Sequence, residues 1–410
     1  MSAKPRHVHA VDLQGLGRLA VDATLGITGI VETMHHNISR VPGPLGKPTQ
    51  KPTKGITGLV YRSIRGVTRL VGGGVDLALA NLASLVGEEP SSRTREAVLA
   101  ALNGVLGDHL AASGNPLAIP MRFRRGGQAL VLRRPSLAKA IAQPTGRILI
   151  LMHGLCRSDL QWERDGHDHG AAIAADPAFV PAYTPVYLQY NSGLHVSTNG
   201  REFASLVESL VRAWPVPVEE IAILAHSMGG LIARSALHYA SESKRAWPAK
   251  VTKIVFLGTP HDGAPLERGG NWVTVVLDKS PYTTAFSRLG KLRSAGITDL
   301  RHGNLLDDDW MGRDRFAASS RVTTKRRLVP LPAGVQCFAA AASLARKSGG
   351  LRERFLGDGL VQVPSALGHG RTPKGALGIA AKRQWIGYGM NHLDLLDRPE
   401  VYDRIRRWLA

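Results

Sequence analysis

The hydrophobic pattern of this chain changes character near residue 118. Before that point, apolar side chains recur at helical spacing in three stretches, Leu16–Met34, Val60–Leu82 and Arg93–Leu110. Four prolines and three lysines fall between residues 41 and 55, and proline at that density favours an extended linker. The pattern therefore predicts an N-terminal helical extension over residues 1–117, with a Pro/Lys-rich linker near residues 41–55.

After residue 118, short continuous apolar runs alternate with helical stripes. Residues 119–132 predict a β-hairpin. Residues 199–214 predict a helix, which Asn199 and Glu202 would start as a capping box. Runs typical of strands buried on both faces occur at residues 147–152, 182–190, 221–225, 253–258 and 335–341. This alternation predicts an α/β fold over residues 118–410, with a mainly parallel sheet flanked by helices.

One segment joins an apolar strand to a serine and then to a helix, in the sequence IAILAHSMGG over residues 221–230. A serine on a sharp strand-to-helix turn needs small residues two positions away, and Ala225 and Gly229 meet that need. The turn would lift the hydroxyl of Ser227 clear of the sheet as a nucleophile. It would also place the Met228 N–H at a helix N-terminus, where it can stabilise a developing oxyanion.

A second segment, LMHGL over residues 151–155, directly follows the predicted strand 147–152. We expect the Leu155 N–H to be the second oxyanion donor, with Gly154 allowing the backbone to approach. His153 is interpreted mainly as a support for this loop. Together with Gly154, three histidines are expected to contact substrate, namely His153, His226 and His261.

A serine nucleophile on this kind of sheet requires an acid and then a histidine later in the chain. His392 lies just before a predicted terminal helix, so it is the expected base. Asp358, between two glycines, is the expected acid that orients its imidazole. Asp262 is the alternative acid, whereas Asp394 and Asp397 follow His392 too closely to lie behind its ring.

These motifs together resemble those of the bacterial lipase and esterase branch of the α/β-hydrolases, over about residues 118–410. The matching motifs are AHSMGG, HGL, GTPHDG, GDGLV and MNHLDLL. The resemblance implies an α/β-hydrolase fold and cleavage of carboxylic esters through an acyl-enzyme. It assigns Ser227 as nucleophile, Asp358 as acid and His392 as base, with Leu155 and Met228 as oxyanion donors.

The resemblance also implies a lid between the serine segment and the acid, which residues 268–331 match in position. Secreted members of this branch bind calcium through an aspartate and a glutamine after the catalytic histidine. Asp394 matches the aspartate, but Arg398 stands where the glutamine belongs. No metal and no cofactor are therefore expected.

Composition bears mainly on partners and location. The net charge of +20 favours anionic partners, and Arg62, Arg65 and Arg69 flank the second apolar stripe. We expect a lipid or small-molecule ester substrate. The N-terminal apolar stripes are expected mainly to pack on the catalytic domain or on each other, and peripheral contact with an anionic membrane or lipid surface is the alternative. No nucleic-acid-binding module is recognisable, so nucleic acid is not an expected partner. The first residues lack an uninterrupted apolar segment, which favours a cytoplasmic protein.

Two other functions remain compatible with the sequence. A lipid acyltransferase would use the same serine, aspartate and histidine but release the acyl group to an alcohol instead of water. A non-catalytic protein that binds lipid surfaces would explain the charge and the amphipathic N-terminal stripes, although it would not need an intact set of catalytic residues.

Overall fold

The computed structural model describes most of the chain in separate stretches. These are residues 9–39, most of 62–77, and then 91–264, 294–312, 327–346, 357–370 and 375–410. The predicted linker near residues 41–55 and much of the predicted lid lie outside the described residues.

The chain divides into two compact units. The smaller contains Met1–Arg95 and Leu110–Ala118, and the larger contains Glu96–His109 and Ile119–Ala410. Two helical regions of the smaller unit are α1 (Ala10–Ser39) and the helical residues within 62–77. Within this unit, Arg95 donates to both carboxylate oxygens of Asp12 at 2.6 and 2.7 Å. Helix α3 (Arg93–Ala112) belongs for most of its length to the larger unit.

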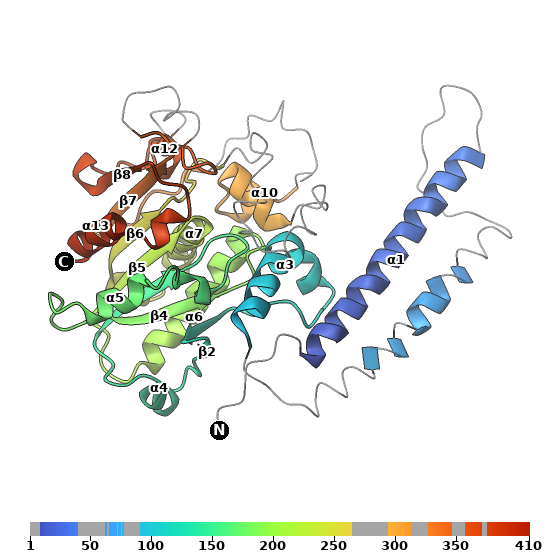
Figure 1. Ribbon diagram of the computed structural model, residues 1–410, viewed down its shortest axis with the longest axis horizontal. Helices are drawn as coiled ribbons and strands as arrows, with labels where there is room; N and C mark the ends of the chain where they lie inside the picture. The colour runs from blue at the N-terminus through green and yellow to red at the C-terminus, as the bar shows by residue number, and fades with distance from the viewer. Residues whose placement is uncertain are drawn as a thin grey trace. The chain divides into compact units, whose positions relative to one another are not determined.

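In the larger unit, the described strands form one eight-stranded sheet in the order β2-β1-β4-β3-β5-β6-β7-β8 (Figure 1). Their bounds are β1 (Arg122–Arg125), β2 (Gln128–Ala129), β3 (Arg147–Met152), β4 (Thr184–Gln189), β5 (Glu220–His226), β6 (Val251–Leu257), β7 (Gln336–Ser343) and β8 (Gln384–Tyr388). The pairs β1–β2 and β1–β4 are antiparallel, and all others are parallel. This mainly parallel sheet with flanking helices confirms the predicted α/β-hydrolase fold class.

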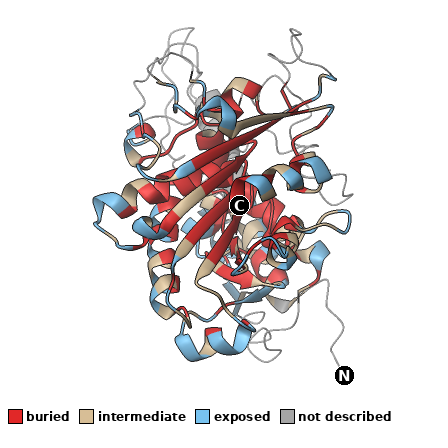
Figure 2. Cartoon of the chain, turned by 90° about the vertical axis from the view of Figure 1, so that its left-hand side faces the viewer, coloured by how far each residue is buried: buried red, intermediate tan, exposed pale blue. Residues whose placement is uncertain are grey.

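Helices cover both faces of the sheet. Alternate residues of β3 enter two different apolar cores, with Ile148 and Ile150 in one and Leu149 and Leu151 in the other. The first core also takes side chains from α6 (Val196–Ala213) and α7 (Met228–Glu242). The second takes side chains from α5 (His169–Ala175) and α13 (Pro399–Leu409). Figure 2 shows the buried residues gathered along the central strands and the helix faces that pack on them.

The start of α6 differs from the prediction. The helix begins at Val196, and Asn199 is a buried interior residue whose side chain donates to the Asn191 carbonyl at 2.9 Å. The Val196 N–H instead donates to Asp299 Oδ2 at 2.8 Å. The predicted capping box at Asn199 and Glu202 is therefore wrong, because a carboxylate distant in sequence satisfies the helix terminus.

Asp299 lies on α10 (Ala295–His302), which falls within the range of the predicted lid. Ile297 and Leu300 of α10 are buried in the first core. A Cβ added to Gly296 would lie only 2.0 Å from the Ser192 carbonyl oxygen, so this helix packs directly against neighbouring backbone. Across the described stretches, no helix combines the length and apolar character needed to cross a bilayer.

Candidate active site

Ser227 lies in the tight turn between β5 and α7. Its backbone has φ 54° and ψ −122°, a conformation that costs a non-glycine residue free energy unless the surroundings hold it. The Ser227 N–H donates to the Leu257 carbonyl at 2.8 Å. A Cβ on Gly229 would lie 2.7 Å from the Met152 carbonyl oxygen, so only glycine lets α7 start this close to β3. The turn is therefore held by both neighbouring strands.

The loop after β3 passes directly against this serine. A Cβ added to Gly154 would lie 2.9 Å from the Ser227 Cβ and 3.5 Å from its Oγ. Leu155 follows at the edge of the cavity that contains Ser227. Met228 is the first residue of α7, so its N–H has no acceptor within the helix. The geometry brings together the two segments predicted to supply oxyanion donors.

Asp358 and His392 form a close buried pair. Asp358 Oδ2 lies 2.6 Å from His392 Nδ1, and both side chains are at most 3% exposed. The other carboxylate oxygen accepts from the Leu360 and Val361 N–H groups at 2.9 and 2.7 Å. A carboxylate only accepts, so His392 Nδ1 carries the hydrogen and Nε2 remains for another partner. Asp358 follows β7 and His392 follows β8, at the end of the sheet where β5 ends.

Ser227 and His392 line the same small cavity, of about 20 Å³. The described residues around it are Gly154, Leu155, Arg157, His226, Ser227, Ala264, Leu300, Leu360, Val361, His392 and Leu393. A volume of this size holds about one water molecule, whereas pockets for larger ligands typically measure hundreds of Å³. An acyl substrate therefore requires the lining side chains to move.

Arg157 is a charged lining residue that was not predicted from the sequence. It is 5% exposed, and it follows the HGL segment by only two residues. Its proximity to that segment was the available signal, but an arginine in a loop is usually exposed. Its charge opposes protonation of His226, which adds to the effect of burial.

His153 is fixed beside the cavity and is not one of its lining residues. Its ring stacks on Tyr190 with centroids 4.1 Å apart, and its Nδ1 lies 2.8 Å from the Gly154 carbonyl oxygen. The Tyr190 hydroxyl donates to the His153 carbonyl at 2.6 Å. Burial lowers the pKa of His153 to about 3, so the ring is neutral at physiological pH. These contacts fit a support for the loop.

The other two histidines have different surroundings. His226 lines the cavity, its Nε2 lies 3.2 Å from the His392 carbonyl oxygen, and the two rings are 4.6 Å apart. Burial, followed by the charges of His392 and Arg157, holds the pKa of His226 well below its usual value. His261 does not line this cavity, and its Nδ1 lies 3.3 Å from a guanidinium nitrogen of Arg234.

The carboxylates of Asp394 and Asp397 take part in other contacts, and the contact described for Asp262 is made by its backbone. Asp394 Oδ2 accepts from the Asn391 N–H at 2.8 Å and lies 4.0 Å from Arg398. Asp397 pairs with Arg164 at 2.8 Å. The Asp262 N–H donates to the Ser365 hydroxyl at 3.1 Å. Among the described residues, no group of three or more His, Cys, Asp or Glu side chains has the arrangement of a metal site.

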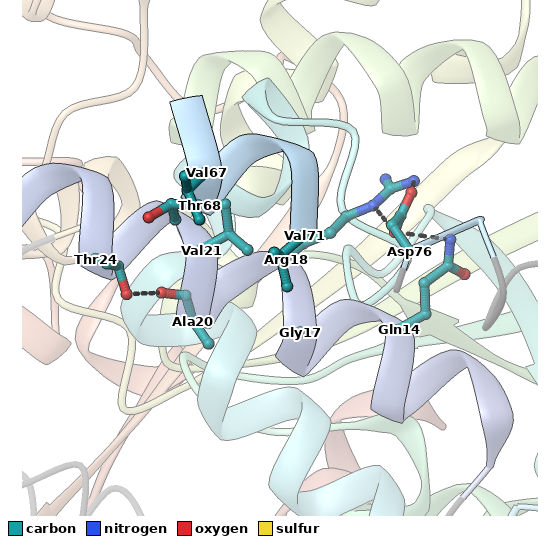
Figure 3. A pocket seen from close by; sticks show the side chains of 10 residues that line it. All are labelled: Gln14, Gly17, Arg18, Ala20, Val21, Thr24, Val67, Thr68, Val71 and Asp76. Carbon is teal, nitrogen blue, oxygen red and sulfur yellow. Dashed lines mark hydrogen bonds and ion pairs between the residues drawn. The ribbon is translucent and has the colours of Figure 1, made fainter. Parts of the chain in front are cut away.

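The smaller unit contains a larger cavity, of about 450 Å³ (Figure 3). Arg18 and Gln14 both donate to Asp76 at its polar end, the Arg18 Nη2 at 2.8 Å and the Gln14 amide at 3.1 Å. Val21, Val67 and Val71 supply much of its apolar wall. Its lining residues include no serine, cysteine or histidine.

Comparison with known proteins gives one family match. A model of the PGAP1-like alpha/beta domain matches residues 202–329, which include Ser227 and α7. The match covers less than half of the chain. No curated protein matches.

Several solved structures show limited similarity. A gene product of Listeria innocua is 14% identical, with 64% of this chain and 93% of that chain covered and a TM-score of 0.34. Aspergillus fumigatus lipase B is 13% identical, with 67% and 57% covered and a TM-score of 0.37. Phospholipase PlaB from Legionella pneumophila is 15% identical, with 54% and 44% covered and a TM-score of 0.33. At these TM-scores the similarities do not bear on the activity of this chain.

Proposed function

We propose that this protein is a serine hydrolase that cleaves carboxylic esters through an acyl-enzyme on Ser227. The observation that carries the proposal is the 2.6 Å contact between Asp358 and His392, whose imidazole borders the same cavity as the serine hydroxyl. A hydroxyl alone is a weak nucleophile at neutral pH and needs an adjacent base that a third group orients.

In the proposed mechanism, His392 Nε2 removes the hydroxyl proton as Ser227 Oγ attacks the ester carbonyl. The negative charge that develops on the carbonyl oxygen is held by the N–H groups of Leu155 and Met228. Asp358 stabilises the imidazolium, which then protonates the leaving alcohol. Water releases the acyl group in a second attack. Loss of one oxyanion donor typically lowers turnover by about a hundred- to a thousand-fold.

The cavity lining favours an apolar acyl group. Most of its side chains are aliphatic, namely Leu155, Ala264, Leu300, Leu360, Val361 and Leu393. Apolar walls gain free energy by removing hydrocarbon from water, at about 25 cal/mol per Å². We therefore propose lipid esters or other esters with aliphatic acyl groups as substrates.

A panel of p-nitrophenyl esters of increasing acyl length tests this proposal, with Ser227→Ala as the control. We expect hydrolysis by the wild-type protein and a loss of nearly all activity in Ser227→Ala, with an unchanged thermal melting temperature. Activity that is equal in the two proteins would refute the assignment of Ser227.

We also propose that the smaller unit contacts an anionic lipid surface. Leu70 and Val67 are 79% and 61% exposed, and Arg62 and Arg69 are exposed on the same helical stretch. Exposed apolar side chains beside arginines are typical of helices that lie in a membrane interface. The net charge of +20 adds attraction to anionic head groups.

A further inference from the structure

His226, next to the serine in the chain, has one ring nitrogen with an identified partner. The side chain is 2% exposed, and Nε2 lies 3.2 Å from the His392 carbonyl oxygen. Because a carbonyl oxygen only accepts hydrogen bonds, Nε2 carries the hydrogen. The ring is neutral, since burial holds its pKa well below the usual value. Nδ1 is therefore a hydrogen-bond acceptor.

The His226 side chain lines the catalytic cavity. Nδ1 of His226 is buried and has no hydrogen-bond partner among the described residues. A Cβ added to Gly154 would lie 3.1 Å from His226 Nδ1 and 2.9 Å from the Ser227 Cβ. Gly154, His226 Nδ1 and Ser227 are therefore close neighbours. A buried acceptor without a donor is energetically unfavourable. The adjoining cavity of about 20 Å³ has room for one water molecule to supply the donor.

We propose that His226 Nδ1 positions the water molecule that releases the acyl group from Ser227. This inference rests on the proposed function. The water donates one hydrogen to His226 Nδ1 and the other to His392 Nε2, and its oxygen attacks the acyl carbonyl. His392 takes the second proton as the new C–O bond forms. The bond from carbon to Ser227 Oγ then breaks, and Oγ takes that proton back as the acid leaves.

The two acceptors also distinguish water from alcohols. An alcohol has one O–H hydrogen, which His392 Nε2 must accept for the attack to proceed. His226 Nδ1 is then left without a donor, and a neutral hydrogen bond of this kind is worth about 0.5–1.5 kcal/mol. His226 therefore favours hydrolysis over acyl transfer to an alcohol, by roughly threefold to tenfold.

Two substitutions separate the two ring nitrogens. In His226→Gln, the amide nitrogen reaches toward the position of Nε2 and can keep the bond to the His392 carbonyl, but no acceptor remains at the position of Nδ1. In His226→Asn, the shorter side chain can place an oxygen acceptor near the position of Nδ1. The pair therefore removes the proposed acceptor in one variant and restores it in the other.

The test follows release of p-nitrophenol in stopped flow, and measures the ratio of methyl ester to free acid when methanol is present. We expect His226→Gln to release acid about threefold to tenfold more slowly relative to its own rate of acylation, and to raise the ester-to-acid ratio by a similar factor. His226→Asn should return that ratio toward the wild-type value.

An unchanged ester-to-acid ratio in His226→Gln would overturn the inference. An equal decrease in the rates of acylation and of acyl release would also overturn it, because it would indicate a structural role for His226. The ratio is decided after the acyl-enzyme forms, so it is informative whichever step limits the overall rate. Absence of any hydrolysis by the wild-type protein would instead refute the proposed function together with this inference.

Discussion

At the scale of single residues, the candidate site depends on side chains whose orientation is fixed by backbone groups. Ser227 adopts φ 54°, a conformation that costs of order 1–3 kcal/mol, and its N–H is held by the Leu257 carbonyl at 2.8 Å. Asp358 accepts hydrogen bonds at both carboxylate oxygens, so it has little freedom to turn away from His392. Because backbone groups hold these side chains in place, a single substitution at one of them should change catalysis more than it changes the fold.

Asp358→Asn tests the role of the carboxylate. The asparagine oxygen can still accept the N–H groups of Leu360 and Val361, so we expect the fold to be retained. The amide cannot stabilise an imidazolium, and a donor facing His392 Nδ1 favours the wrong tautomer. We expect kcat to fall by about 10³- to 10⁴-fold, as measured with a soluble ester, with a small change in melting temperature. A kcat within tenfold of wild type would contradict the assigned role.

Residue types were easier to predict than their contacts. Ser227, Asp358 and His392 were selected from motifs whose order along the chain has a mechanistic reason, and the structure places the last two in direct contact. The acceptor at His226 Nδ1 could not be predicted, because it depends on which ring nitrogen meets the His392 carbonyl. The burial of Arg157 could not be predicted either, since it depends on how distant segments pack over the loop.

At the scale of elements, the loop that follows β3 connects the sheet to the site. The buried strands β3 and β5 were predicted to within one residue at each end, because their continuous apolar runs leave few alternatives. β8 was not predicted, since Gln384 and Gly387 interrupt its apolar pattern. The predicted start of α6 was wrong because Asp299, about a hundred residues away in the chain, accepts the hydrogen bond from the first N–H of the helix.

Gly154→Ala tests how closely this loop must pass the nucleophile. The new Cβ would lie 2.9 Å from the Ser227 Cβ and 3.1 Å from His226 Nδ1, so the loop or the serine must shift. A displacement near 1 Å at reacting groups can reduce the rate by about a hundredfold. We expect kcat/KM to fall at least tenfold, while circular dichroism shows a folded protein. Full activity of this variant would exclude the close packing described.

The pH dependence of stability reflects a buried ionic cluster beside the same loop. Arg124 Nη1 lies 2.9 Å from both Asp159 Oδ1 and Glu96 Oε2, so two carboxylates share one guanidinium. Burial is the main cause that raises the pKa of Asp159 to about 6. The folded state then binds this proton more tightly than the unfolded state, so the contribution to stability is lost as pH rises from about 4 to about 6.

Asp159→Asn removes that titration while keeping an acceptor for Arg124. We expect the free energy of unfolding of the wild-type protein to fall relative to the variant between pH 4 and 6, by at most about 3 kcal/mol. Urea denaturation of both proteins across this range measures the difference. A constant difference, or one that changes in the opposite direction, would show that Asp159 does not titrate in this way.

At the scale of the whole molecule, the net charge of +20 and the exposed apolar residues of the smaller unit both bear on the proposed contact with a lipid surface. Charge predicted attraction to anions from composition alone, but it could not distinguish one anionic partner from another. The exposed positions of Leu70 and Val67 favour a lipid surface over other anionic partners. At a lipid surface, burial of apolar side chains adds to the electrostatic attraction of the basic protein.

Cosedimentation with phosphatidylglycerol and phosphatidylcholine vesicles tests this contact. We expect binding to the anionic vesicles that weakens with salt, and much weaker binding to the neutral ones. Leu70→Glu should reduce binding, whereas Val180→Glu, at a position that is 85% exposed in the larger unit, should lower it only by the change in charge. Equal binding of the two variants would argue against a specific role for the smaller unit.

If Ser227 is an activated nucleophile, as we propose, it should react covalently with a probe for serine hydrolases. A fluorophosphonate probe should modify the folded wild-type protein once, at the peptide that contains Ser227, and should leave Ser227→Ala unmodified. Labelling should become much slower in His392→Ala, because the base that removes the hydroxyl proton is then missing. A folded wild-type protein that remains unlabelled, or that is labelled at another residue, would contradict the account.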